Sequence, residues 1–205
     1  GHFAKKIAIS FTEAANYFPK DKVAWTGQPI RTGIENKASK KEALNYFKLE
    51  SELPVLLILG GSQGAELINN TILDALPRLV NNYQIIHQTG VQNFKTVSGQ
   101  AEVVLTHNPH KTRYVSMAFL NSLALKMAAG AASLIISRAG SMLFEMASWG
   151  VPSILIPITN TNLDHQKKNA FNYARAGACS VVEEANMTAN ILSGEVERIM
   201  GDKEG

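Results

Sequence analysis

The chain has 205 residues, of which 45% are hydrophobic and 18% are charged, and its formal net charge is +3. This composition is typical of a globular protein and excludes a disordered or fibrous one. The longest apolar runs fall far short of the roughly 18 residues that a transmembrane helix needs, and the first residues form no secretory signal, so we expect a soluble, cytoplasmic protein.

The basic residues are scattered, with the densest clusters at KDK, KASKK and HQKK. This mild positive charge suits an anionic small ligand or an anionic membrane surface. It lacks the basic stripe with interleaved aromatic residues that is typical of nucleic-acid binding, so we expect no nucleic-acid partner. The single cysteine, Cys179, excludes an internal disulfide and a cysteine-based zinc site, and we expect it to be a small core residue.

In chain order, short apolar runs alternate with segments of helical periodicity. The expected strands are KIAIS (6–10), VLLIL (55–59), YQIIH (83–87), AEVVLT (101–106), SLIIS (133–137), SILIPI (153–158) and CSVVE (179–183). The expected helices are TEAANYF (12–18), VQNFKTV (91–97) and residues 64–79, 141–149, 163–176 and 187–200. The polar stretch IRTGIENKASKK (30–41) is expected to be a connection inside the domain.

Strands with little polar alternation, separated by helices, indicate a parallel sheet that is covered on both faces. The sequence therefore predicts an α/β fold, a doubly wound Rossmann-like parallel sheet, in one compact domain. Such sheets bind ligands at the carboxyl ends of their strands. Three loops at expected strand ends have the composition of a ligand site.

The first loop follows VLLIL in the sequence LLILGGSQGAELINN. Gly60 and Gly61 allow a sharp turn, and Ser62 and Gln63 precede a helix that is expected to begin near Gly64. Glycines allow close approach of a ligand, and the free N–H groups of a helix start attract phosphate. Neither a Walker A loop nor a dinucleotide fingerprint is present. A turn that only connects strand to helix is an equally good explanation.

The second loop follows SLIIS and leads into a helix that carries Glu145. A carboxylate there can accept two hydrogen bonds from a ribose diol, and Gly140 and Ser141 can offer backbone donors to a pyrophosphate. Alternatively, Glu145 is only a favourable charge near a helix N-terminus. Arg138 pairs either with phosphate or with a nearby carboxylate, and the sequence does not decide between them.

The third loop follows SILIPI and leads into a helix that carries Asp164, His165, Gln166 and Asn169. The Asp164 and His165 side chains point in different directions on a helix, so we expect neither a catalytic pair nor a metal site. Amide side chains such as Gln166 can donate to and accept from sugar hydroxyls. The alternative is a solvated helix start.

The ordered motifs GGSQGA, HQTG, SRAG, FEMASWGVPSILIP, DHQKKNA and ARAGA resemble the C-terminal half of the MurG family. These enzymes are the bacterial N-acetylglucosaminyltransferases that make lipid II from lipid I. VAWTGQPIR strengthens the resemblance, since the family carries a Gly-Asn-Pro-Val-Arg segment where its second domain begins. The similarity runs from about Lys5 to Gly177.

The resemblance implies that residues 1–205 are a single C-terminal domain, one half of a GT-B glycosyltransferase, that binds UDP-N-acetylglucosamine. It implies inverting transfer without a metal ion or a cofactor. Motifs of the N-terminal domain, which binds lipid I and the membrane in this family, are missing from the sequence. We therefore expect no catalytic residue in this half, donor binding without sugar transfer, and a full-length protein on the cytoplasmic face of the inner membrane.

The resemblance assigns four residues to the nucleotide and its phosphates. Ser62 matches the family's phosphate contact, with Gly61 and Gln63 beside it. Arg31 matches the arginine that walls the nucleotide site. The uracil-facing apolar residue is either Phe119 or Leu120, or else that position is ordinary core packing.

Five further residues are assigned to the ribose and the sugar. Glu145 matches the glutamate that holds the ribose hydroxyls, and Gly140 and Ser141 match the turn that faces phosphate and sugar. Gln166 matches one of two adjacent glutamines that contact N-acetylglucosamine, and His165 replaces the other. The stretch before Glu145 is one residue shorter than the family pattern. His87, in HQTG, is expected to have a supporting role near the interdomain cleft.

Other classes of protein stay open at this point. A subunit similar to this half works with a separate partner in the eukaryotic dolichol-linked N-acetylglucosamine transferase. A non-catalytic nucleotide-sugar-binding module, or a relative of the epimerases that share the GT-B architecture, would also carry such a domain.

Overall fold

The computed structural model describes residues 3–60, 65–158, 165–177 and 179–202. Its Cα packing divides the chain into two compact units, Gly1–Thr32 and Gly33–Gly205. The assignment of residues 1–205 to a single domain stays a prediction. The two units are described separately below.

The first unit contains two short parallel strands, β1 (Ile7–Ile9) and β2 (Val23–Trp25), and the 3-10 helix η1 (Thr12–Tyr17) between them. KIAIS is therefore a strand as expected, whereas TEAANYF forms a tighter 3-10 helix. The Trp25 indole N–H donates to the Ser10 carbonyl over 3.3 Å. Ile9 is the only buried residue among those of this unit whose burial is described, and it is 6% exposed.

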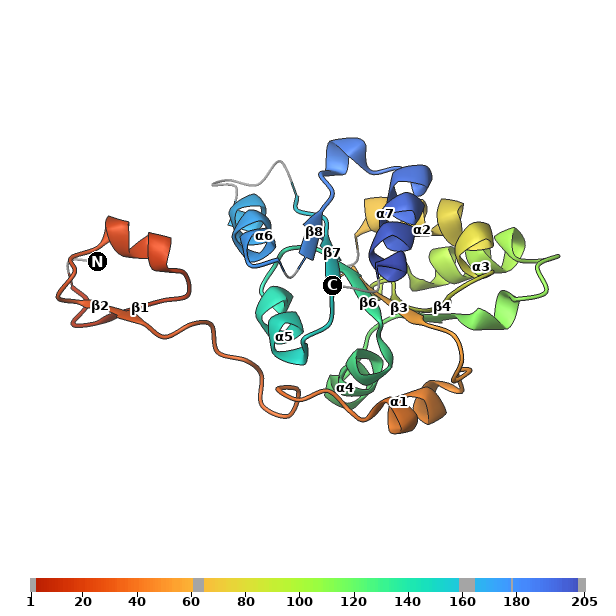
Figure 1. Cartoon of the computed structure of the whole chain (residues 1–205), viewed down its shortest axis with the longest axis horizontal. Helices are drawn as coiled ribbons and strands as arrows, with labels where there is room; N and C mark the ends of the chain where they lie inside the picture. Colours follow the sequence, from red (N-terminus) through yellow and green to blue (C-terminus); the bar gives the residue numbers. More distant parts are fainter. Residues whose placement is uncertain (1–2, 61–64, 159–164, 178, 203–205) are drawn as a thin grey trace. The chain divides into compact units, whose positions relative to one another are not determined.

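The second unit contains a six-stranded sheet in which every neighbouring pair is parallel. In spatial order its strands are β5 (Tyr114–Met117), β4 (Gln84–Gln88), β3 (Val55–Leu59), β6 (Leu134–Ser137), β7 (Ser153–Leu155) and β8 (Cys179–Val181). The chain enters at β3 and proceeds outward to β5, then returns to β6 and proceeds outward to β8 (Figure 1). The predicted doubly wound, Rossmann-like parallel sheet is confirmed, and its direction of winding switches between β3 and β6.

Helices cover both faces of this sheet. They are α1 (Lys40–Phe47), α2 (Glu66–Leu79), α3 (Phe94–Val104), α4 (Ser122–Ala131), α5 (Met142–Trp149), α6 (His165–Arg175) and α7 (Ala189–Gly201). Two 3-10 turns, η2 (Lys111–Arg113) and η3 (Glu184–Asn186), complete the described elements.

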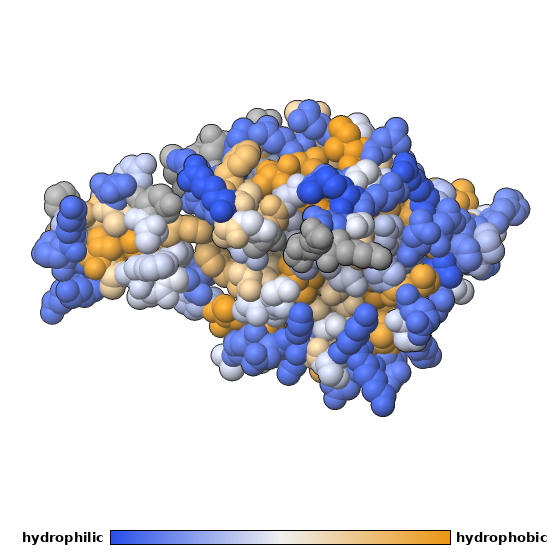
Figure 2. All heavy atoms as spheres, viewed as in Figure 1, coloured by the Kyte–Doolittle hydropathy of each residue, from blue (hydrophilic) through white to orange (hydrophobic). Residues whose placement is uncertain are grey.

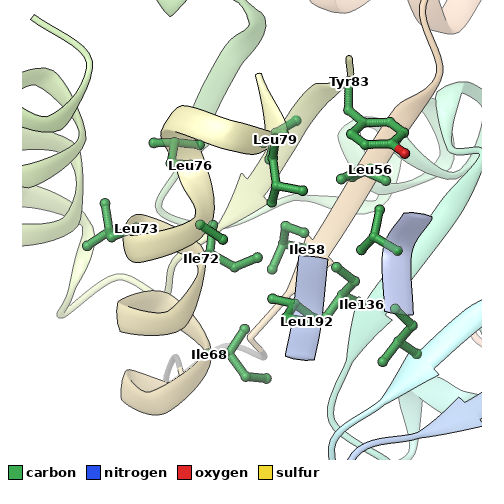
Figure 3. Packing of buried hydrophobic residues seen from close by; sticks show 14 of the residues in the cluster. Leu56, Ile58, Ile68, Ile72, Leu73, Leu76, Leu79, Tyr83, Ile136 and Leu192 are labelled. Carbon is green, nitrogen blue, oxygen red and sulfur yellow. The ribbon is translucent and has the colours of Figure 1, made fainter. Parts of the chain in front are cut away.

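Two apolar cores lie on opposite faces of the sheet. One lies under α2, α3 and α7, and the other under α1, α4, α5 and α6. Successive residues of β3 alternate between them, with Leu56 and Ile58 in the first core and Leu57 and Leu59 in the second. Figure 3 shows Ile58 facing Ile72 of α2 and Leu56 beside Tyr83 in the first core. A strand buried on both faces must be apolar throughout, which explains VLLIL.

The run AEVVLT, expected to be a strand, is mostly the C-terminal part of α3, so that prediction is wrong. Val97, Ala101 and Leu105 are buried, while Val103 is 75% exposed. Burial every fourth residue is a helical pattern, and it continues from the start of α3 through this run. The strand that follows is β5, at YVSM, farther along the chain.

The connection expected at residues 30–41 ends in a helix start. Ser39 caps α1 in a capping box, in which its hydroxyl accepts from the Glu42 backbone N–H and the Glu42 carboxylate accepts from the Ser39 backbone N–H. The hydrogen bonds that this carboxylate accepts from the Ser39 hydroxyl and from the Ser39 backbone N–H lower the pKa of Glu42. The sequence Ser-Lys-Lys-Glu therefore begins a helix within the polar stretch.

The segment before α1 is held against α4 and α5. The Ala38 N–H donates to the Lys126 carbonyl over 3.2 Å, and the Trp149 indole N–H donates to the Ile34 carbonyl over 2.7 Å. Gly130 of α4 permits this approach, since an added Cβ would lie 2.5 Å from the Ala38 carbonyl oxygen. The glycine is therefore required by packing and not by backbone conformation.

Apolar residues also reach the surface, and Figure 2 shows hydrophobic residues among hydrophilic ones on the face that it draws. Phe119 and Leu123, which follow β5, are about half exposed. Among the described residues, no helix combines the length and the apolar character that crossing a bilayer requires.

Candidate functional site

The carboxyl ends of β3 and β6 meet at the point where the sheet changes its winding direction. The Ser137 hydroxyl, at the end of β6, donates to the Leu59 carbonyl at the end of β3 over 3.2 Å. On the other side of β3, the Gly60 N–H donates to the Gln88 carbonyl of β4 over 3.3 Å. Ligands of open α/β sheets bind outside the carboxyl ends of the strands at such a switch point. These two bonds hold together the strand ends from which the candidate ligand-binding loops begin.

Helix α2 begins immediately after the glycine-rich loop. Its N-cap residue is Ala65, which has no side-chain oxygen and makes no capping bond. The first N–H groups of a helix need partners, and alanine is a poor residue for supplying one. This start therefore suits an external anion. Gly61, Ser62 and Gln63, which were predicted to contact phosphate, lie outside the described residues.

The loop after β6 is fixed by Arg138. Its Nη1 atom lies 2.5 Å from Glu184 Oε1 and donates to the Ile156 carbonyl over 3.1 Å. Both charged side chains are largely buried, at 15% and 22% exposure. Of the two possibilities for Arg138, the structure therefore shows pairing with a carboxylate. The ion pair ties the loop after β6 to η3, and the bond to the Ile156 carbonyl ties the same loop to the end of β7.

Gly140, Ser141 and Glu145 follow in the same loop and the first turn of α5. An added Cβ on Gly140 would meet nothing within 4 Å, and Ser141 is exposed, with no side-chain bond that caps α5. Glu145 is 6% exposed. A nearly buried carboxylate within one turn of a helix N-terminus is in a position where the helix dipole favours its charge.

Helix α6 joins the loops after β6 and β7 through two amide side chains. The Asn169 amide donates to the Ala139 carbonyl over 3.3 Å, and the Gln166 side-chain oxygen accepts from the Ile158 N–H over 3.3 Å. The structure thus brings Gln166 to the loop after β7, and it brings the same helix to the loop that carries Gly140 and Ser141. The contact of Asn169 was not anticipated from the sequence.

Two other predicted residues are placed less fully. Arg31 is an exposed residue of the first unit, and His165 is the first residue of α6. Asp164 lies outside the described residues. Among the residues that the structure describes, no group of three or more histidine, cysteine or acidic side chains is arranged to hold a metal ion.

The loop after β5 contains the two candidates for the uracil contact. Leu120 is 2% exposed, and its N–H donates to the side-chain oxygen of Gln88 over 3.0 Å. Phe119 is 49% exposed. Leu120 is therefore a core residue, and of the pair only Phe119 presents an apolar surface to solvent.

His87 lies in the interior of the second unit. It is fully buried in β4, where its ring contacts Tyr114 and Asn69 at 2.9 and 3.0 Å. Burial lowers the pKa of His87 to about 3 and raises the pKa of Tyr114. Both groups are therefore neutral near pH 7.

A doubly wound parallel sheet whose strand-end loops gather at the switch point is the architecture of an α/β ligand-binding domain, the kind of domain that makes up one half of a GT-B enzyme. Comparison with known proteins then gives the family. The chain belongs to the glycosyltransferase family 28 C-terminal domains, whose family model matches residues 55–204.

Relatives are similar over nearly the whole chain. A Bacillus thuringiensis (strain Al Hakam) protein named UDP-N-acetylglucosamine-N-acetylmuramyl-(pentapeptide) pyrophosphoryl-undecaprenol N-acetylglucosamine transferase 3 is 35% identical over 204 residues, or 98% of this chain and 54% of its own length. A Pediococcus pentosaceus transferase of the same type is 34% identical over 203 residues, with the same two coverages. The chain thus spans about half the length of the curated relatives it matches.

Solved structures give the same relationship. The crystal structure of Acinetobacter baumannii MurG is 26% identical, with a TM-score of 0.71 over 97% of this chain and 53% of that one. The resemblance to MurG inferred from the ordered motifs is confirmed by these similarities.

Proposed function

We propose that this chain is the donor-binding half of an N-acetylglucosaminyltransferase that converts lipid I to lipid II. The names of the relatives support the reaction, and the family match supports the assignment to a C-terminal half. The observation that carries the proposal is the meeting of three strand-end loops at the switch point, joined by the bonds of Ser137, Asn169 and Gln166. Its substrate here is UDP-N-acetylglucosamine.

In this proposal, each loop binds a different part of the donor. The diphosphate lies against the uncapped start of α2 and the loop of Gly61, Ser62 and Gln63, where N–H groups and the helix dipole favour anions. Glu145 accepts hydrogen bonds from the ribose hydroxyls. The resemblance to the family also assigns Arg31 to the nucleotide.

The sugar lies between the turn and the start of α6. Gly140 and Ser141 offer backbone N–H groups to the sugar and phosphate, and His165 and Gln166 contact the N-acetylglucosamine. A side-chain amide suits this task, since it donates to and accepts from hydroxyls at once.

During transfer, the acceptor hydroxyl displaces UDP from the anomeric carbon with inversion. Negative charge builds up on the leaving diphosphate, and fixed N–H groups at the start of α2 stabilise it without the help of a metal ion. The part of the relatives that this chain does not span supplies the binding site for the acceptor lipid I and the catalytic base. The same part makes the contact with the cytoplasmic face of the inner membrane. Near-attack alignment needs both parts, so this chain alone binds the donor without transferring sugar.

Calorimetric titration of UDP-N-acetylglucosamine, UDP-glucose and UDP into wild-type protein and Glu145→Gln tests the proposal. Glutamine keeps the size of the side chain and removes its charge. Since hydrogen bonds to a charged group are the stronger ones, we expect binding of all three ligands to weaken about tenfold or more. Glu102→Gln, at an exposed position of α3, is the matched control and should bind normally. Absence of UDP binding to the wild-type chain at millimolar concentration would refute donor binding by this half.

A further inference from the structure

A chain of buried polar groups runs from the edge strand β5 through β4 to the start of α2. The Tyr114 hydroxyl lies 2.9 Å from His87 Nδ1, and His87 Nε2 lies 3.0 Å from Asn69 Oδ1. The Asn69 amide nitrogen then donates to the Thr89 carbonyl over 3.0 Å. His87, Asn69 and Thr89 are each at most 1% exposed.

The direction of every hydrogen bond in this chain follows from its last member. The Thr89 carbonyl can only accept, so the amide nitrogen of Asn69 faces it and the amide oxygen faces His87. His87 Nε2 must therefore carry the proton and donate, which leaves Nδ1 to accept from the Tyr114 hydroxyl. The histidine is neutral, in a single tautomer, with both ring nitrogens hydrogen-bonded.

This chain of bonds fixes the part of α2 that adjoins the glycine-rich loop. Asn69 lies in the first turn of α2, and its backbone N–H donates to the carbonyl of Ala65, the N-cap residue. Thr89 lies in the turn after β4, where its own N–H donates to the Met117 carbonyl at the end of β5. The Asn69 side chain thus joins the helix start to the carboxyl end of β4, and the Thr89 backbone joins that end in turn to the end of β5.

The apolar contacts of α2 alone would not determine its position so narrowly. Ile68, Ile72 and Leu76 press the helix on the sheet (Figure 3), but apolar attraction has no preferred direction and tolerates small shifts along the sheet. A hydrogen bond depends on both distance and angle. The bond from His87 to Asn69 therefore fixes the position of the α2 start along the sheet and its rotation about the helix axis.

We propose that His87 is a positioning residue for the donor diphosphate, and that with Tyr114 and Asn69 it holds the start of α2 in the geometry that binds phosphate. This inference rests on the proposed donor-binding function. In this inference His87 acts by holding the start of α2 in place, and it makes no contact with the ligand. Loss of the network is expected to weaken binding of the diphosphate and to leave binding of the nucleoside part intact.

The test compares UDP with uridine as probes in amide NMR titrations. His87→Leu removes both hydrogen bonds, and Tyr114→Phe removes only the hydroxyl donor. His87→Gln is the conservative variant, since its side-chain N–H can still donate to Asn69. Ser116→Ala is the matched control, because the Ser116 hydroxyl lies on the same strand as Tyr114 and bonds to Ser98, which is not on α2.

We expect His87→Leu to weaken UDP binding about tenfold, the size of one or two lost hydrogen bonds, with uridine affinity unchanged. His87→Gln should recover most of the loss, and Ser116→Ala should match the wild type. Fluorescence of buried Trp149, measured with Trp25→Phe in every variant, confirms that each variant is folded. If His87→Leu does not fold, Tyr114→Phe carries the test, with a smaller loss for UDP alone.

Equal weakening of UDP and uridine, or no change for either ligand in a folded variant, would overturn the positioning role while leaving donor binding established. A wild-type chain that binds neither probe would overturn the proposed function as well. The two failures are therefore distinguishable. The imidazole NMR spectrum of the wild type gives an independent check, because any tautomer other than the one protonated at Nε2 contradicts the direction of the bonds.

Discussion

Replacing Gly130 with alanine sets helix propensity against packing. Gly130 lies inside α4, where alanine is normally more favourable than glycine by about 1 kcal/mol. The added Cβ would lie 2.5 Å from the Ala38 carbonyl oxygen and 2.9 Å from the carbonyl carbon. Both are backbone atoms, so the clash cannot be relieved by rotating a side chain. The backbone around Ala38, which is also held by the bond from the Ala38 N–H to the Lys126 carbonyl, must move away from α4.

The expected magnitude follows from these two opposing effects. Overpacking costs roughly 1–3 kcal/mol, and subtracting the gain in helix propensity leaves a loss of up to about 2 kcal/mol in the free energy of unfolding. Gly99→Ala in α3 and Gly194→Ala in α7 are matched controls, because both glycines are exposed and an added Cβ there meets nothing within 4 Å. They should raise the stability by up to about 1 kcal/mol.

Urea unfolding followed by Trp149 fluorescence measures the difference. Trp25→Phe in every variant removes the signal of the first unit, so the transition reports the second unit alone. Trp149 is 3% exposed and bonds to Ile34, in the same segment as Ala38, so it also responds to local displacement. If Gly130→Ala raises the free energy of unfolding as much as the two controls do, the Ala38 backbone does not approach α4 as closely as described.

Three further predictions concern the buried polar groups of the second unit. Trp149→Phe should lower the free energy of unfolding by about 1–3 kcal/mol in a denaturant titration followed by circular dichroism, because the Ile34 carbonyl loses its buried donor. Partial burial raises the pKa of Cys179 to about 11, so the thiol should react with a disulfide reagent more slowly at pH 8 in the native chain than in denaturant, and equal rates would contradict this partial burial. Burial lowers the pKa of His87 from 6.5 to about 3, so between these pH values only the unfolded chain binds the extra proton. The free energy of unfolding should therefore fall by about 1.4 kcal/mol for each pH unit as the pH drops through this window. Urea titrations at pH 7 and pH 5 measure this fall, and His87→Gln should lack the contribution of His87 to it.

The strands of the second unit could be predicted because most of them are buried on both faces. VLLIL and SLIIS have no polar alternation, which is the pattern of a central parallel strand. AEVVLT was wrongly predicted to be a strand because it also lacks polar alternation. Its apolar residues Val103 and Val104 are exposed on a helix. The start of α1 could have been found from the Ser39 to Glu42 capping box.

The candidate site could be predicted only to the level of its loops. Topology places the carboxyl ends of neighbouring strands together, so the meeting of the loops after β3, β6 and β7 follows from the order of the strands. Side-chain partners distant in sequence do not follow. The pairing of Arg138 with Glu184 and the bond from Asn169 to Ala139 depend on packing that no local pattern encodes.

The small first unit determines where proteases should cut the chain first. Parallel strands are normally covered on both faces, yet the pair formed by β1 and β2 contributes a single buried residue, Ile9, among those whose burial is described. Local opening there requires little free energy, so proteases should cut first within residues 3–32. The resistant fragment that remains, residues 33–205, would keep the switch point and all the described loops around it and would lose Arg31. Comparing UDP binding by this fragment and by the whole chain would therefore measure what the first unit adds.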